Sequence, residues 1–208
     1  MQLVAMGAQD VYLTGNPQIT FFKVVYRRHT NFSKECIEQT FNGSLSAAGA
    51  GTLNCTLSRN GDLVQEIYLT GTYDSATLGD DNTDMIKTVE VEIGGQKIDK
   101  HYSQWLDIYN ELFETDSSHA RRALLAGTGG TSGTVYIPLR FWFNRNPGLA
   151  LPLIALQYHE VKINVECQVS AGSGKFTATP KLLVNYLYLD TDERRRFAQV
   201  SHEYLIEQ

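Results

Sequence analysis

Alternation of apolar and polar side chains is the dominant pattern in this chain. Between residues 161 and 169 every second side chain is apolar and those between are polar: Val161, Ile163, Val165, Cys167 and Val169 against Lys162, Asn164, Glu166 and Gln168. Because successive side chains of a strand point to opposite faces, this run predicts a half-buried antiparallel strand. The same period, clean or interrupted, predicts strands at 19–26, 35–41, 52–58, 63–70, 86–93, 135–143 and 181–189.

Residues that favour tight turns lie between these runs. Asn42-Gly43, Asn60-Gly61-Asp62, Gly94-Gly95 and Gly172-Ser173-Gly174 provide positions where a positive φ costs little. Short connections of this kind join antiparallel neighbours, so the pattern indicates an antiparallel architecture.

The segment from about 99 to 127 departs from the period of two. Apolar side chains recur there at helical spacing, at Tyr102, Trp105, Leu106, Tyr109, Leu112 and Phe113, and predict one amphipathic helix. Its aromatic stripe is expected to pack on the strands, or else to face a partner chain. A second, shorter helix is predicted at 118–126. Together these elements predict an all-β fold, an eight-stranded antiparallel jelly-roll sandwich with one helical insertion at about 99–127.

The chain divides into a central domain and two arms. No composition shift, Pro-rich linker or internal repeat interrupts residues 19–190, which we take as one jelly-roll domain. Residues 1–18 form a predicted N-terminal arm, and residues 191–208 a C-terminal connector or arm rich in charge at its start. Several side chains of the arms have no obvious place in the core, and we expect them to contact other subunits: Tyr12, Leu13, Asn16, Pro17, Phe197, Tyr204, Leu205 and Ile206.

The charge balance argues against one large class of partners. The 208 residues carry 18 Lys and Arg against 23 Asp and Glu, a net charge of -5. No overall basic field is available to hold a nucleic acid backbone, so direct nucleic acid binding is not expected. No apolar run reaches the roughly 18 residues of a membrane-spanning helix, and we predict no transmembrane segment.

The sequence contains no recognisable pattern of catalytic or metal-binding residues. The histidines, at 29, 101, 119, 159 and 202, lack the spacing that brings two imidazoles to one metal. The Gly-rich stretch 127–133 lacks the lysine of a phosphate-binding loop, and the acidic loop 80–84 lacks the turn glycine and final Glu of a calcium loop. Cys36, Cys55 and Cys167 are widely spaced and predict free thiols. We therefore predict that the protein is not an enzyme and has no catalytic residue, cofactor or metal site.

Four segments resemble one known family. They run from Gly7 to Phe32, from Glu92 to Trp105, from Pro138 to Ile163 and from Asp190 to Gln208, and include the motifs GNPQITFFKVVYRRHTNF and LRFWFNRNPGLALPLIALQYHE. Together they are similar to the N-terminal jelly roll of the major capsid protein of large nucleocytoplasmic DNA viruses, most closely the type found in viruses of algae. The resemblance covers nearly the whole chain, and its motifs are long.

The resemblance implies a structural role. In that family two jelly rolls form one chain, three chains form a pseudo-hexagonal capsomer, and capsomers tile an icosahedral shell. The final HEYLIEQ resembles the passage into the second jelly roll, so we expect one jelly roll here, and a trimeric capsomer if a second is supplied. The implied partners are other copies of the capsid protein and minor capsid proteins beneath the shell. The implied location is the virion, assembled in the host cell cytoplasm.

The leading hypothesis is therefore a structural subunit of an icosahedral viral capsid. The alternative from another class is a carbohydrate-binding jelly-roll module for host attachment, with exposed aromatic side chains and the acidic loop 80–84 as its site. A metalloenzyme of the cupin type shares the architecture, but the histidine spacing counts against it. Self-assembly, glycan binding and a retained metal would distinguish the three.

Overall fold

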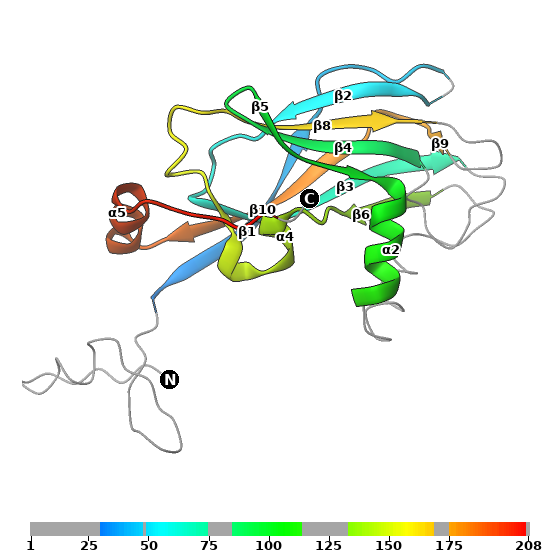
Figure 1. The fold of residues 1–208 in the computed structure, drawn as a ribbon. Helices are drawn as coiled ribbons and strands as arrows, with labels where there is room; N and C mark the ends of the chain where they lie inside the picture. The colour runs from blue at the N-terminus through cyan, green and yellow to red at the C-terminus, as the bar shows by residue number, and fades with distance from the viewer. Residues whose placement is uncertain (1–29, 48, 75–84, 114–132, 169–174, 207–208) are drawn as a thin grey trace, which may run out of the picture.

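The structure is a computed structural model that describes residues 30–47, 49–74, 85–113, 133–168 and 175–206. Within these ranges two antiparallel sheets lie face to face around one core (Figure 1). The strands are β1 (Phe32–Thr40), β2 (Gly51–Thr56), β3 (Leu63–Asp74), β4 (Ile86–Ile93), β5 (Gln96–Tyr102), β6 (Gly133–Pro138), β7 (Leu151–Pro152), β8 (Val161–Cys167), β9 (Lys175–Phe176) and β10 (Lys181–Leu189). The helices are α2 (Ser103–Phe113), α4 (Trp142–Arg145) and α5 (Thr191–Gln199), with one 3-10 turn, η2 (Pro147–Leu149).

The strand order is that of a jelly roll. One sheet has the order β1-β10-β3-β6, with β7 and β9 also paired to β3, and the other has the order β2-β8-β4-β5. The chain crosses repeatedly between the sheets, so that β1 and β10 lie side by side although one opens the domain and the other closes it. This interleaved, antiparallel arrangement confirms the predicted jelly-roll sandwich.

The apolar side chains that recur at every second position form the core between the two sheets. In β8 the side chains of Val161, Ile163, Val165 and Cys167 are buried, and those between them are partly exposed. Alternate residues of β10 are buried in the same way on the facing sheet. Each such side chain contributes about 1.5–3 kcal/mol when it leaves water. The alternation read from the sequence is therefore the pattern that drives the two sheets together.

The hairpin between β4 and β5 turns at Gly94-Gly95, as predicted. The two glycines have φ of 60° and 84°, a conformation that glycine adopts without strain. β5 then continues to Tyr102, so the predicted insertion at about 99–127 is wrong at its start, where residues 99–102 are strand. The inward side chains of this part of β5 are Asp99 and His101. Because both are polar, the sequence shows no alternation of apolar and polar residues here.

The predicted strand 135–143 is also shorter than expected. β6 ends at Pro138, and the residues from Trp142 begin the short helix α4. Phe141, Trp142 and Phe143 are all buried, so the alternation ends where the backbone leaves the sheet. The side chain of Asn144 donates a hydrogen bond to the carbonyl of Gln65 in β3 and fixes α4 against that strand.

The remaining predicted elements have mixed outcomes. Helix α2 forms where the helical spacing predicted it, from Ser103 to Phe113. The predicted helix 118–126 and strand 19–26 lie outside the described residues. The charge run after Asp190 forms helix α5, whose first backbone N–H, that of Thr191, donates to the Asp190 carboxylate. Acidic residues in its first turn and Arg196 in its last turn suit the helix dipole.

Candidate interaction surfaces

The histidines and acidic residues of the described ranges lie apart from one another or pair in twos. Within these ranges no three His, Cys, Asp or Glu side chains gather where they could hold a metal ion. The buried His101 places Nε2 3.1 Å from Asp99 Oδ2 and stacks on the ring of Phe141 at 4.7 Å, so it is part of the core. His159 is exposed, and His202 contacts the carbonyl of Phe197. None of the described helices is long and apolar enough to cross a membrane.

The three cysteines differ in accessibility. Cys55 and Cys167 are buried in the core, and burial raises the pKa of their thiols to about 11 and about 12. Both thiols are therefore protonated at neutral pH and shielded from reagents. Cys36 is exposed on β1, so it is the thiol that a reagent in solution can reach.

The outer face of the β2-β8-β4-β5 sheet is charged. We call it the charged face, and it consists of Lys87, Glu90, Glu92, Lys97, Lys100, Lys162 and Glu166 with polar neighbours such as Thr52 and Asn54. Glu90 binds Lys97 at 2.8 Å and Lys100 at 3.0 Å, and Glu166 binds Lys87 at 2.7 Å. The hydrogen bond from Lys97, together with Lys100, holds the pKa of the Glu90 carboxyl below its usual 4.5. This surface is that of a sheet that faces water.

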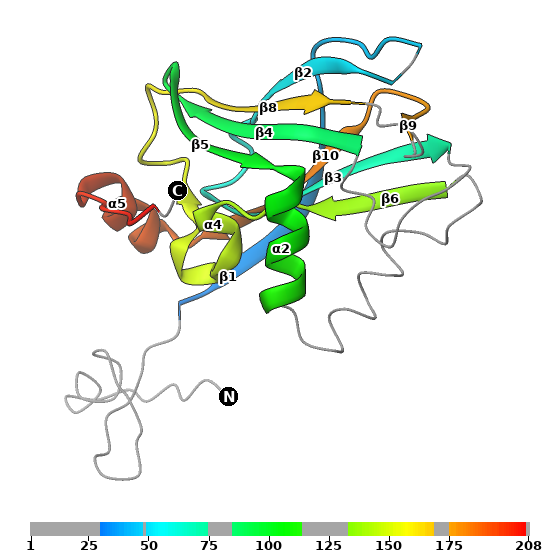
Figure 2. The ribbon, with the colours of Figure 1, turned by 45° about the vertical axis from the view of Figure 1, so that its right-hand side comes forward.

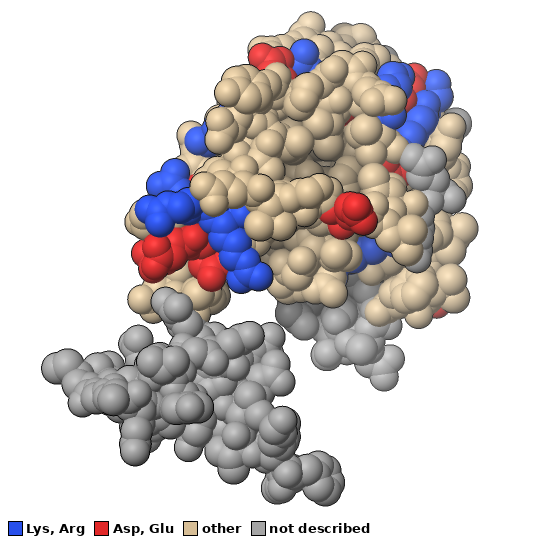
Figure 3. Space-filling view, turned by 60° about the vertical axis from the view of Figure 1, so that its left-hand side comes forward, with Lys and Arg blue, Asp and Glu red and all other residues tan. Residues whose placement is uncertain are grey.

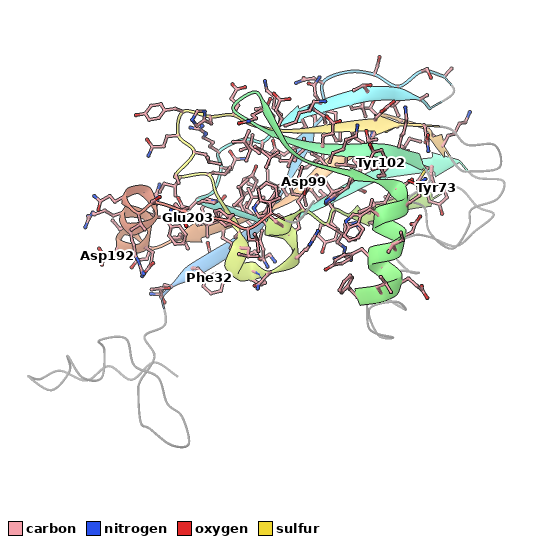
Figure 4. The ribbon with its side chains drawn as sticks, in the orientation of Figure 1. Phe32, Tyr73, Asp99, Tyr102, Asp192 and Glu203 are labelled. Atoms are coloured by element: carbon pink, nitrogen blue, oxygen red, sulfur yellow. The ribbon has the colours of Figure 1, made fainter. Side chains whose placement is uncertain are left out.

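The outer face of the β1-β10-β3-β6 sheet is chemically different. In β10 the buried residues alternate with Leu183, Asn185, Leu187 and Leu189, which therefore point outward and are partly exposed. Directly paired residues share a face, and across from these leucines lie Tyr68 and Phe32 on the neighbouring strands. We call this surface the apolar face and define it by Phe32, Tyr68, Tyr136, Leu183, Leu187 and Leu189. Phe32, at the start of β1 (Figure 4), is 68% exposed.

Charged side chains on the apolar face are paired with one another. Lys34 Nζ lies 3.1 Å from Glu66 Oε2, which also accepts a hydrogen bond of 2.6 Å from Asn185. Lys181 Nζ lies 2.8 Å from Glu38 Oε1. These pairs leave the centre of the face without a free charge of either sign. Cys36 belongs to the same face, because it pairs with Asn185 across the two strands.

Helix α2 is only half packed against the sandwich. Leu106 is buried, and Trp105 and Tyr109 are partly buried, but Leu112 and Phe113 are 69% and 64% exposed. In Figures 1 and 2 the helix runs from β5 past the edge strand β6, so that its last turn projects beyond the sheets. The predicted packing of the aromatic stripe is confirmed for the first two turns. The last turn presents its apolar side chains to the outside.

The predicted contact residues of the two arms fall into three groups. Tyr12, Leu13, Asn16 and Pro17 lie outside the described residues. Tyr204 and Ile206 pack partly against the core of their own domain, and Tyr204 donates a hydrogen bond of 3.2 Å to the carbonyl of Ala150. Phe197 is half-buried and stacks on His202 at 5.4 Å, whereas Leu205 is 84% exposed. The expectation that the core is complete without the C-terminal arm is wrong for Tyr204 and Ile206.

Charges gather at the end of the molecule where α5 lies. Figure 3 shows basic and acidic side chains in neighbouring clusters on that side, beside a broad area with few charges. The basic residues of α5 pair with nearby carboxylates, and Arg194 Nε lies 2.9 Å from Asp62 Oδ1. Asp62 also accepts a hydrogen bond from the backbone of Leu189, so this pair joins α5 to the end of β10.

Comparison with known proteins identifies the family. The family model described as "Major capsid protein N-terminus" matches residues 20–190. The major capsid protein of Pyramimonas orientalis virus is 58% identical over all of this chain and 57% of its own length, and that of Paramecium bursaria Chlorella virus 1 is 49% identical over all of this chain and 51% of its own. The quasi-atomic model of the PBCV-1 virus capsid superposes with a TM-score of 0.77 at 42% identity, over 90% of this chain and 49% of that one.

These matches place the protein among viral capsid proteins with a jelly-roll fold. The chain belongs to the major capsid protein family, and the match is to the N-terminal part. The resemblance read from the four sequence segments is confirmed. The chain spans about half the length of the relatives that it matches.

Proposed function

We propose that this chain is a structural subunit of an icosahedral viral capsid, equivalent to the first jelly roll of a double jelly-roll major capsid protein. The observation that carries the proposal is the continuous match of the whole chain to proteins named major capsid protein, at up to 58% identity. Both the sequence and the fold agree with those relatives over the same residues. No catalytic role is proposed.

The architecture suits a part of a shell wall. Its two sheets share one continuous apolar core, which makes the domain rigid. A wall subunit needs side surfaces that recognise other subunits, and the sandwich offers outer faces of different character, one densely charged and one with partly exposed leucines beside two ion pairs. Such a surface asymmetry supports assembly in a defined orientation.

The proposed partners are other copies of the capsid protein and minor capsid proteins beneath the shell. Because the chain spans about half the length of its relatives, we propose a trimeric capsomer formed when a second jelly roll is supplied. Residues 1–18, with Tyr12, Leu13, Asn16 and Pro17, and the exposed Leu205 are the proposed contacts to these partners. The proposed location is the virion, with assembly in the host cytoplasm. A net charge of -5 supports the absence of direct nucleic acid binding.

Carbohydrate binding is the weaker alternative. Exposed aromatic residues are present, such as Tyr158 at 93% and Tyr102 at 52%, but the acidic loop 80–84 lies outside the described residues. The relatives that match the whole chain are named capsid proteins, which favours the structural role.

Electron microscopy and glycan-array binding on the purified chain separate the two functions. A capsid subunit forms regular oligomers or sheets at high protein concentration when the second jelly roll of a related major capsid protein is supplied, and it binds no glycan. A carbohydrate-binding module stays dispersed and binds a defined oligosaccharide. Dispersed particles together with saturable glycan binding would therefore overturn the proposed function.

A further inference from the structure

We propose that Asn60 is a site of slow covalent self-modification, where loss of the side-chain amide gives aspartate or isoaspartate. The substrate is the chain itself, and the co-reactant is water. The proposal goes beyond the proposed function and does not depend on it. It rests on the pair Asn60-Gly61, on the free hydrogen-bonding groups of the turn around it, and on the contrast with the other Asn-Gly pair, Asn42-Gly43.

The chemistry needs only the side chain of an asparagine and the backbone nitrogen of the residue that follows. The nitrogen of Gly61 loses its proton and attacks the side-chain carbonyl carbon of Asn60. A carbon–nitrogen bond forms, and the side-chain nitrogen takes up a proton and leaves as ammonia. Water then opens the resulting succinimide ring at either of its carbonyl groups, which gives aspartate or isoaspartate. Glycine favours the reaction, because it has no side chain to shield the attacking nitrogen.

The packing of the domain requires a glycine at position 61. A Cβ atom at this position would lie 2.7 Å from the Cβ of Tyr186 and 3.2 Å from the carbonyl oxygen of Leu187, both in β10. Tyr186 is fully buried, so its Cβ cannot move aside without disturbing the core. A larger residue that would slow the reaction is therefore excluded, and Asn60 keeps its most reactive neighbour.

The turn leaves the reacting groups free. Asn60 is exposed between β2 and β3, and among the described residues neither its own polar groups nor the N–H of Gly61 has a hydrogen-bond partner. The residues on either side are held: the Arg59 guanidinium donates to three carbonyls of the loop 156–159, and the N–H of Asp62 donates to β10 at 2.9 Å. Ring closure at Asn60 therefore breaks no hydrogen bond of the described fold.

Asn42-Gly43 contains the same two residue types, but the sheet fixes it. The N–H of Asn42 donates to the carbonyl of Asn54 at 2.7 Å, and the carbonyl of Asn42 accepts from the N–H of Asn54 at 3.1 Å. The ring cannot close on an extended backbone, so Asn42 must turn the peptide group that it shares with Gly43. That rotation breaks the hydrogen bond to its carbonyl. The sheet therefore protects Asn42, whereas the turn leaves Asn60 reactive.

The modification alters a turn that connects separate parts of the molecule. Arg59 holds the loop 156–159, and Asp62 holds α5 through Arg194 at 2.9 Å. Each event adds a negative charge two residues before Asp62, and the isoaspartate form also lengthens the backbone between the two anchoring residues. We therefore expect the modified chain to unfold at a lower urea concentration than the fresh chain.

The experiment ages the purified 208-residue chain in neutral and mildly alkaline buffer prepared with heavy-oxygen water, followed by peptide mapping with mass spectrometry. The heavy oxygen marks residues that were modified during ageing and separates them from those modified during digestion. In the folded chain Asn60 should react at least about tenfold faster than Asn42, which reacts only in molecules whose strand has opened locally. The rate should increase with pH, because the attacking nitrogen must lose its proton.

The chain unfolded in urea is the matched control, and both asparagines should react there at similar rates. Asn60→Gln keeps the side-chain amide but requires a less favourable six-membered ring, so it should remove the modification without changing the circular dichroism spectrum. A folded chain in which Asn60 stays intact while the unfolded control reacts would overturn the proposal. A rate at Asn42 equal to or above that at Asn60 in the folded chain would also overturn it. Neither result bears on capsid assembly, which sedimentation measures separately.

Discussion

At the scale of single residues, Glu90 links the charged face to the stability of the fold. Its carboxylate is 11% exposed and binds two lysines, Lys97 and Lys100, at 2.8 and 3.0 Å. These lysines lower its pKa from the usual 4.5, and burial opposes them in part. A carboxyl group whose pKa is lower in the folded state stabilises the fold above its unfolded pKa, and that stability is lost as the pH falls through the folded pKa.

The first prediction concerns the substitution Glu90→Gln. It removes a partly water-screened ion pair, so we expect a loss of about 0.5–1 kcal/mol in the free energy of unfolding at neutral pH. Below pH 4.5 the difference between the variant and the wild type should shrink, because the unfolded chain takes up the proton first, and it should vanish as the pH falls through the lower pKa of the folded carboxyl. Urea unfolding of the variant and the wild type, at neutral pH and well below pH 4.5, measures the difference in the free energy of unfolding under both conditions. An equal difference at neutral and acid pH would contradict the role given to the ion pairs.

At the scale of elements, α2 divides into a packed part and a free part. Leu106 is 2% exposed and belongs to the core, whereas Leu112 in the last turn is 69% exposed. Trp105 lies between these extremes, partly buried beside the rings of His101 and Tyr109. The helix is thus anchored by its first two turns.

The second prediction compares two leucines of this helix. Leu106→Ala should cost about 2–5 kcal/mol, since it leaves a cavity in the core. Leu112→Ala should cost less than about 0.5 kcal/mol in the isolated chain, because its side chain is already in water. Thermal or urea unfolding of the two variants measures this. Similar losses for both would show that the last turn is packed against the domain as well.

The third prediction concerns the segment after α5. Tyr204 and Ile206 pack partly on the core, and burial raises the pKa of the Tyr204 hydroxyl. Removal of residues 201–208 should therefore lower the free energy of unfolding by about 1–3 kcal/mol, from the apolar area of two partly buried side chains. Leu205→Ala, at an exposed neighbour in the same segment, is the control and should leave stability unchanged. If the truncation leaves the unfolding midpoint unchanged, the segment does not stabilise the domain and is a free arm.

At the scale of the whole molecule, the sequence predicted the architecture better than its polar details. Most long strands bury alternate apolar residues, so the period of two located them, as in β8 and β10. The period of two did not locate all of β5, because its inward residues Asp99 and His101 are polar although they are buried. β7 and β9 have two residues each, too few for a period. Helix α5 was not predicted, because its sequence is mostly charged and has no apolar stripe; its cap and its charges stabilise it.

The interaction surfaces were only partly predictable. The apolar residues of the arms were predicted to contact other subunits. Two of them, Tyr204 and Ile206, pack partly against the core of their own domain. The apolar face was less visible, because its members come from four strands that only the fold brings together. One signal was available in the sequence: residues 181–189 are apolar at both odd and even positions, unlike the strictly alternating 161–167.

The central claim is that this chain is a wall subunit that associates with copies of itself. Sedimentation velocity of the purified 208-residue chain, from dilute to concentrated solution, tests it most directly. The claim predicts a species of 23.3 kDa when dilute and discrete multiples of that mass as the concentration rises. A single 23.3 kDa species at every concentration, both alone and with the second jelly roll of a related major capsid protein added, would contradict it.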